Sequence, residues 1–169
     1  MLTLNADDRF ASASLSNLLD NIHILATPTR SIAELAQELD VPKGAIINPV
    51  LCAVAGKPTL VLMAGDKACD AAQVARVLNM KGTVSMMSDQ DIEALTGAGI
   101  DQLFPVDLSK HVPTVLDASL KRFDTVYSRA GNVKCLIATS FAELKSLTGG
   151  VISYAVACPT WHPTPFNQG

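Results

Sequence analysis

Two apolar runs in the first half of the chain constrain its fold more than any other feature. Residues 46–54 and 59–63 consist mostly of Ile, Val, Leu, Met and Thr, and the short segment Gly56-Lys57-Pro58 connects them. Such residues favour strands, and a brief connection that contains glycine and proline is typical of a turn. The sequence therefore predicts a β-hairpin over residues 46–63.

Apolar residues at helical spacing predict helices on both sides of this hairpin. Two helices begin at capping boxes, Ser31-Ile32-Ala33-Glu34 and Ser140-Phe141-Ala142-Glu143, in which serine and glutamate satisfy each other's backbone amides. Glycines follow two of the helices, at the positions where helices commonly end. The expected helices cover residues 15–22, 32–39, 71–78, 88–97 and 140–149.

Further short strands are expected near residues 83–86, 114–116, 125–127, 133–138 and 151–156. Residues 97–113 contain two glycines and two prolines without periodicity, which predicts a long loop, and long loops in compact domains are usually functional. Hairpins mixed with single helices do not alternate as a doubly wound parallel sheet requires. The pattern favours an α/β fold of the α+β type, with a mixed or antiparallel sheet and helices packed around it.

Composition excludes several classes of protein. The chain has 169 residues, which suits one domain, and its 49% apolar and 17% charged residues argue against disorder. A net charge of -3 and only 5% aromatic residues argue against a broad nucleic-acid binder. No run reaches the roughly 18–20 apolar residues of a membrane helix, and the first residues lack the pattern of a signal peptide. We therefore expect a cytoplasmic protein without membrane contact.

The sequence gives no sign of a metal, a cofactor or a common catalytic motif. Its four cysteines lie far apart, so we expect reduced and mostly buried thiols, and its three histidines lack the spacing of metal ligands. A glycine-rich dinucleotide motif, a Walker A motif and a serine nucleophile elbow are all absent from the sequence.

The order of several segments nevertheless resembles the YbaK and prolyl-tRNA-synthetase-associated family of aminoacyl-tRNA editing domains. The resemblance extends over about residues 15–156. It rests on residues 32–44 (IAELAQELDVPKG), 58–66 (PTLVLMAGD), Leu95-Thr96-Gly97 leading to Pro105, and residues 115–120 (VLDASL) through Val126-Tyr127 and Ala130-Gly131 to Leu147-Thr148-Gly149.

The resemblance implies a mixed, curled β-sheet flanked by helices, formed by residues 1–157 and followed by a proline-rich extension over residues 158–169. It also implies hydrolysis, in trans, of the ester that joins a wrong amino acid to the 3′ end of a tRNA. Alanine or cysteine on the tRNA for proline is a frequent substrate in the family. Because this ester is already activated, the site must mainly position the substrate and a water molecule.

The resemblance assigns catalysis to two positions. Asn48 stands where the family has a lysine, so an amide replaces a full positive charge, and Asp117 keeps the family's character. Two simpler interpretations remain open: Asn48 before Pro49 is an ordinary strand-edge residue, or Asp117 only caps the following turn. The substrate-binding residues implied by the resemblance are Gly97, Gly99, Asp101, Pro105, Ser119, Arg129, Gly131 and Asn132.

Basic residues gather in one part of the chain. Residues 109–150 contain six basic and three acidic residues, a net charge of +3, so the rest carries -6 of the total of -3. A local basic segment of this kind fits weak, salt-sensitive contact with the 3′ end of a tRNA. The alternative is a non-catalytic binding or regulatory module that reuses the editing fold within a longer signalling protein, which the missing lysine, Asp101 and Arg129 favour.

Overall fold

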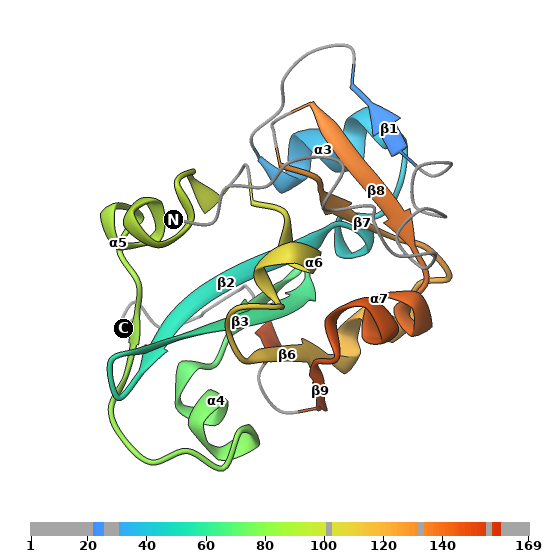
Figure 1. Ribbon diagram of the computed structural model, residues 1–169. Helices are drawn as coiled ribbons and strands as arrows, with labels where there is room; N and C mark the ends of the chain where they lie inside the picture. Colours follow the sequence, from blue (N-terminus) through green and yellow to red (C-terminus); the bar gives the residue numbers. More distant parts are fainter. Residues whose placement is uncertain (1–21, 26–30, 101–102, 132–133, 155–156, 160–169) are drawn as a thin grey trace.

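The centre of the fold is a five-stranded mixed sheet (Figure 1). The computed structural model describes residues 22–25, 31–100, 103–131, 134–154 and 157–159. In the order β5-β2-β3-β6-β9, β2 is antiparallel to β3 and β5, while β6 is parallel to β3 and β9. The strands are β2 (Ile47–Val54), β3 (Lys57–Ala64), β5 (Val84–Met86), β6 (Thr114–Asp117) and β9 (Val151–Ser153).

Strands β2 and β3 form the predicted hairpin, with an unbroken register from Ile47 opposite Ala64 to Val54 opposite Lys57. The turn consists of two residues, Ala55 and Gly56, with φ of 53° and 81°. Positive φ at both central residues gives a turn whose twist matches that of the flanking strands. The hairpin is confirmed, but its turn lies slightly earlier than expected, because Lys57 and Pro58 already belong to β3.

Two smaller sheets complete the strand arrangement. The antiparallel sheet β1-β8-β7 contains β1 (Ile22–Ile24), β7 (Val126–Arg129) and β8 (Cys135–Thr139). A single bridge between Ile46 and Tyr127 connects its β7 strand to the residue before β2. The second small sheet pairs β4 (Lys67–Cys69) with β10 (Ala157–Pro159), so the chain next to the expected boundary at residue 157 contacts the body of the fold.

The described part of the chain contains five α-helices, and local signals explain their ends. The Ser31 and Ser140 hydroxyls each accept a hydrogen bond from the backbone amide three residues on, and Ser140 and Glu143 form the full reciprocal capping box. Gly97 and Gly149 end two helices in the left-handed conformation. The helices are α3 (Ile32–Leu39), α4 (Ala71–Val77), α5 (Asp89–Thr96), α6 (Pro105–Leu108) and α7 (Phe141–Thr148).

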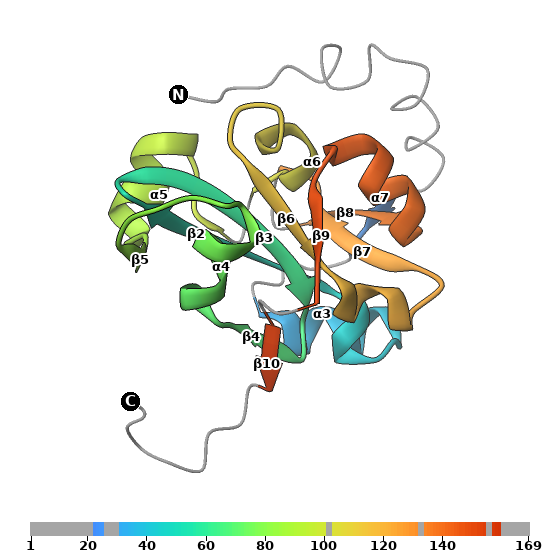
Figure 2. The same ribbon diagram turned by 90° about the horizontal axis from the view of Figure 1, so that it is seen from below.

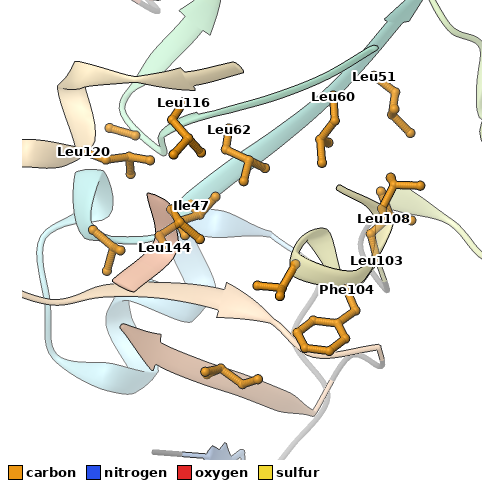
Figure 3. Packing of buried hydrophobic residues seen from close by; sticks show 14 of the residues in the cluster. Ile47, Leu51, Leu60, Leu62, Leu103, Phe104, Leu108, Leu116, Leu120 and Leu144 are labelled. Carbon is orange, nitrogen blue, oxygen red and sulfur yellow. The ribbon is translucent and has the colours of Figure 1, made fainter. Parts of the chain in front are cut away.

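The two faces of the five-stranded sheet pack against different elements. One face, through Val61, Met63 and Val115, packs on Val74 of α4, and the buried Cys52 belongs to this cluster. The other face forms the larger core with α5, α6, α7 and the strands β7 and β8. Figure 3 shows this core, in which leucines of β2, β3 and β6 face Leu103, Phe104 and Leu108. Figure 2 shows the sheet from a second direction, with α4 separated from α6 and α7.

The structure confirms the mixed α/β fold class and corrects several local expectations. Ile22 was assigned to the first helix but begins β1, and residues 15, 18 and 19 of that helix lie outside the described residues. Residues 97–113 are not a continuous loop, because Pro105 begins the buried helix α6, which is too short to produce helical periodicity. The last predicted strand ends at Ser153, and the short strand β4 was not expected.

Candidate functional site

The two predicted catalytic residues lie in one row across the five-stranded sheet. Asn48 of β2 stands opposite Met63 of β3, and Asp117 of β6 stands opposite Ser153 of β9. The parallel register of β3 and β6, continued by one residue, sets Met63 beside Asp117. Residues paired across strands share a face, so all four side chains lie on the α4 face of the sheet. We call these four residues the transverse row.

The spacing of strands gives the distance between the two predicted catalytic residues of this row. Asn48 and Asp117 are separated by the width of β3, which places their Cα atoms about 9–10 Å apart. The Asn48 amide nitrogen lies 3.4 Å from the carbonyl oxygen of Lys67, at the start of β4. Met63 between them is fully buried. The two polar side chains therefore flank a buried methionine and do not contact each other directly.

Asp117 organises the turn that follows β6. Its carboxylate accepts a hydrogen bond of 2.8 Å from the Ser119 amide and caps the 3₁₀-helix η4 (Ala118–Arg122). The Ser119 hydroxyl oxygen accepts a hydrogen bond of 3.1 Å from the Ala64 amide, at the end of β3. Asp117 is 3% exposed. The predicted capping role of Asp117 is confirmed, and its carboxylate and Ser119 lie together at the carboxyl end of β3 and β6.

An ion pair that the sequence did not indicate holds the other end of η4. The Arg122 guanidinium contacts both carboxylate oxygens of Asp66, at 2.6 and 3.0 Å, and its Nε donates to the Ser119 carbonyl at 2.8 Å. The hydrogen bond from Arg122 lowers the pKa of Asp66, and the charges of Arg122 and Lys67 act in the same direction against partial burial. Gly65-Asp66 is part of a segment that carries the family resemblance, but nothing in the sequence paired Asp66 with Arg122.

Close packing of two glycines surrounds this ion pair. A Cβ atom added to Gly65 would lie 2.5 Å from the Lys43 carbonyl oxygen and 2.8 Å from that of Ile46. A Cβ atom added to Gly44 would lie 2.7 Å from the Phe123 ring. Residues 43–46 therefore approach Gly65 at backbone distance, which requires glycine at position 65, whereas Gly44 makes room for a side chain.

The glycines and the proline expected to bind substrate lie on the other face of the sheet. Gly97 ends α5 with φ of 80°, and Pro105 is the buried first residue of α6. Leu103 and Phe104 lead into α6 and pack into the larger core, away from the α4 face that holds the transverse row. Gly99 is half-buried between α5 and α6, and Asp101 lies outside the described residues. The structure therefore does not bring this group together with Asn48 and Asp117 on one face.

The last group of predicted residues lies at the end of β7. Arg129 is only 7% exposed and stands opposite Leu136 of β8. Gly131 is exposed and adopts a φ of 95° in the connection to β8, and Asn132 lies outside the described residues. A buried arginine does not contribute to a surface patch. The structure thus places the eight described residues of this set in three groups, and the β7 group is joined to the residue before β2 by the bridge between Ile46 and Tyr127.

The basic segment also presents less surface charge than its sequence suggests. Lys110 lies 4.0 Å from Asp107, Arg122 is paired with Asp66, and Arg129 is buried. The Lys121 side chain lies at the surface near Tyr154. Among the described residues no group of three or more His, Cys, Asp or Glu side chains is arranged to hold a metal ion. No helix in that part of the chain has the length and apolar character to cross a membrane.

The aminoacyl-tRNA editing domain matches residues 26–147 of this sequence, which is more than half of the chain. The chain therefore belongs to the aminoacyl-tRNA editing domain family. It is similar to the proline–tRNA ligase of Levilactobacillus brevis, with 30% identity over 113 residues. That match covers 66% of this chain and 20% of the ligase, so the chain spans about a fifth of the length of this relative.

Two solved structures share the fold of this chain. A hypothetical protein of known crystal structure superposes with a TM-score of 0.74 and 27% identity, covering 81% of this chain and 90% of that one. A second crystal structure, of a candidate trans-editing enzyme for prolyl tRNA synthetase, has a TM-score of 0.73 and 22% identity over 90% of this chain and 98% of that one. The second likeness concerns the fold, which is the mixed α/β arrangement described above.

Proposed function

We propose that this chain is an aminoacyl-tRNA deacylase that acts in trans on mischarged tRNA. Membership of the editing-domain family supports this function, and the position of one buried carboxylate adds support from the structure. The buried Asp117 carboxylate lies at the end of β6 beside Ser119, in the same row as Asn48. Alanine or cysteine on the tRNA for proline is the substrate class we propose, by analogy with the family and with the ligase relative.

The proposed reaction is attack of water on the ester carbonyl. The water oxygen bonds to the carbonyl carbon, the bond to the ribose oxygen breaks, and free amino acid and tRNA result. In this proposal Asp117 orients the water, accepts its proton and passes it to the departing ribose oxygen, while the Asn48 amide donates a hydrogen bond to the carbonyl oxygen. An amide stabilises negative charge less than a lysine, so we expect slow turnover.

Ser119, whose amide donates to the Asp117 carboxylate and whose hydroxyl accepts from the Ala64 amide, is the substrate-binding residue that this arrangement supports best. The roles of Gly99, Asp101, Arg129, Gly131 and Asn132 in binding the tRNA end stay predictions. Gly97 and Pro105 have structural functions at a helix end and a helix start, which account for their residue types without a ligand.

A deacylation assay tests the proposal directly. We would incubate the protein with a full set of mischarged tRNAs and follow amino acid release, in parallel with Asn48→Lys and with Gln90→Lys. The second variant adds the same charge at an exposed position on α5, which packs on the other face of the sheet from the row. We expect release above the buffer rate by the wild-type protein, at least a severalfold gain in Asn48→Lys, and no change in Gln90→Lys.

Two outcomes would refute the proposed function. No release by any of the three proteins would exclude hydrolysis. Release by Asn48→Lys alone would identify a decayed editing site and favour the non-catalytic module that the sequence left open. The proposed tRNA contact is tested separately, because a contact with phosphates must weaken as salt rises. Affinity for tRNA that stays constant between low and high salt would refute it.

A further inference from the structure

A lysine between two aromatic rings stands out on the surface of the domain. The Lys121 ammonium lies 5.3 Å from the centre of the Tyr154 ring and 5.4 Å from that of Phe141, and it donates a hydrogen bond of 3.0 Å to the Tyr154 hydroxyl. Tyr154 is 78% exposed, and it is the one aromatic side chain among the exposed large apolar residues of the described part of the chain. We call these three residues the aromatic clamp.

The clamp is assembled from three separate elements. Lys121 lies in η4, Phe141 is the first residue of α7, and Tyr154 follows directly after β9. Figure 2 shows β9 along the edge of the sheet beside β6, with α7 adjacent. Because sequence positions 121, 141 and 154 meet only in the folded chain, no local motif indicates this cluster.

The residues of the clamp are close in the chain to those of the transverse row. Tyr154 comes one residue after Ser153, which is paired with Asp117. Lys121 belongs to the short helix that the Asp117 carboxylate caps. Phe141 packs on the core at the other face of the sheet from the transverse row, so a ligand that contacts both the clamp and Asp117 has to pass around the edge strand β9.

Packing does not account for an aromatic ring in this position. A tyrosine that is 78% exposed buries little surface, so it contributes little hydrophobic stabilisation. Its contact with Lys121 is a surface cation–π pair, which also contributes little at exposed sites. Proteins that bind single-stranded nucleic acid use this combination, because exposed rings stack on unpaired bases and a nearby cation attracts the backbone.

We propose that Tyr154, with Lys121 and Phe141, binds the unpaired nucleotides at the 3′ end of an acceptor stem by base stacking. The inference rests on the proposed function for the identity of the RNA. In this arrangement the Tyr154 ring stacks on a base next to the terminal adenosine, and the Lys121 ammonium contacts a phosphate. The clamp holds the end of the tRNA while the aminoacyl ester reaches the transverse row.

A binding assay without any chemistry tests the clamp. The probe is a fluorescent RNA hairpin with a four-nucleotide unpaired 3′ end, and its control is the same hairpin with a blunt end. We expect the wild-type protein to prefer the tailed hairpin, as measured by anisotropy. Tyr154→Ala should weaken binding of the tailed hairpin by about 5-fold or more, the loss expected for one stacked base. Tyr154→Phe keeps the ring and should bind within about 2-fold of wild type.

Met86→Ala is the matched control, because Met86 is an exposed apolar residue on β5, the opposite edge of the same sheet. This variant should leave binding unchanged. A thermal unfolding midpoint for each variant separates loss of binding from loss of folding. Tyr154→Ala that stays folded and binds like wild type would overturn the inference, and so would equal binding of tailed and blunt hairpins.

The two proposals fail in different ways. Tyr154-dependent binding of the tailed hairpin by a protein that hydrolyses no aminoacyl-tRNA would support the clamp and refute the deacylase. Normal hydrolysis together with unaltered KM in Tyr154→Ala would support the deacylase and overturn the clamp.

Discussion

The position of Asp117 allows its structural role to be separated from its proposed catalytic role. Its carboxylate accepts the hydrogen bond from the Ser119 amide at 2.8 Å that caps η4. Replacing a capping aspartate by alanine costs about 0.5–2 kcal/mol, typically about 1 kcal/mol. In a domain of this size, 1 kcal/mol lowers the unfolding midpoint by roughly 2–4 °C. Asparagine caps as well as aspartate, so Asp117→Asn should unfold close to the wild-type temperature.

The same pair of variants gives different results for activity. If Asp117 accepts a proton from the attacking water, Asp117→Asn loses that function although the turn stays capped. We expect kcat/KM for mischarged tRNA to fall by about 100-fold or more, which is the lower range for loss of a general base. Asp117→Ala should lose activity to the same extent and stability in addition. Deacylation rates and thermal unfolding, measured on the same preparations, give both quantities.

One combination of results would refute this reasoning. If Asp117→Asn unfolds like wild type and also hydrolyses like wild type, the carboxylate serves only as a cap. Any gain of activity in Asn48→Lys would then need an explanation in which Asp117 is not the general base. A loss of stability in Asp117→Asn as large as that in Asp117→Ala would show that the second carboxylate oxygen is needed for the fold, and would contradict the capping argument.

Two further predictions concern the packing around η4. Gly65→Ala should destabilise the fold by about 1–3 kcal/mol, lowering the unfolding midpoint by roughly 2–12 °C, because the added methyl meets two backbone carbonyl oxygens. A midpoint equal to that of wild type would contradict the close approach described here. The pKa of Asp66 is lowered, so its ion pair with Arg122 stabilises the fold fully at pH values above the ordinary aspartate pKa, near 3.9. This stabilisation is lost as the pH falls through the lowered pKa of Asp66. Because both side chains are partly exposed, this ion pair stabilises the fold by at most about 1 kcal/mol. The difference in unfolding midpoint between wild type and Asp66→Asn should vanish in acid. A difference that grows in acid would contradict the stabilising role of the ion pair.

Local sequence signals predicted the elements whose ends depend on near neighbours. The serine caps at Ser31 and Ser140, of which only the second is a full capping box, and the terminal glycines Gly97 and Gly149 work through contacts three or four residues apart, so they are visible in the sequence. The hairpin of β2 and β3 was predicted for the same reason. Helix α6 was not, because four residues are too few for a periodic pattern and only burial against the sheet holds Leu103 to Leu108 in place.

The candidate site was predicted in part. The resemblance selected Asn48, Asp117 and Ser119, which the fold brings to one region, but it also selected Gly97 and Pro105, which the fold places on the other face of the sheet. A strand exposes successive side chains to opposite faces, so the face of a residue depends on register. Register between strands that lie far apart in the sequence has no local signal.

The sequence by itself therefore determined the helix ends, the central hairpin, the mixed fold class and the family. Only the tertiary structure decided which polar residues share a face, that Arg122 pairs with Asp66 across 56 positions of the chain, and that Lys121 lies between Phe141 and Tyr154. The physical reason is the range of the interactions. Caps and turns depend on residues a few positions apart, whereas sheet register and surface clusters depend on how distant segments pack.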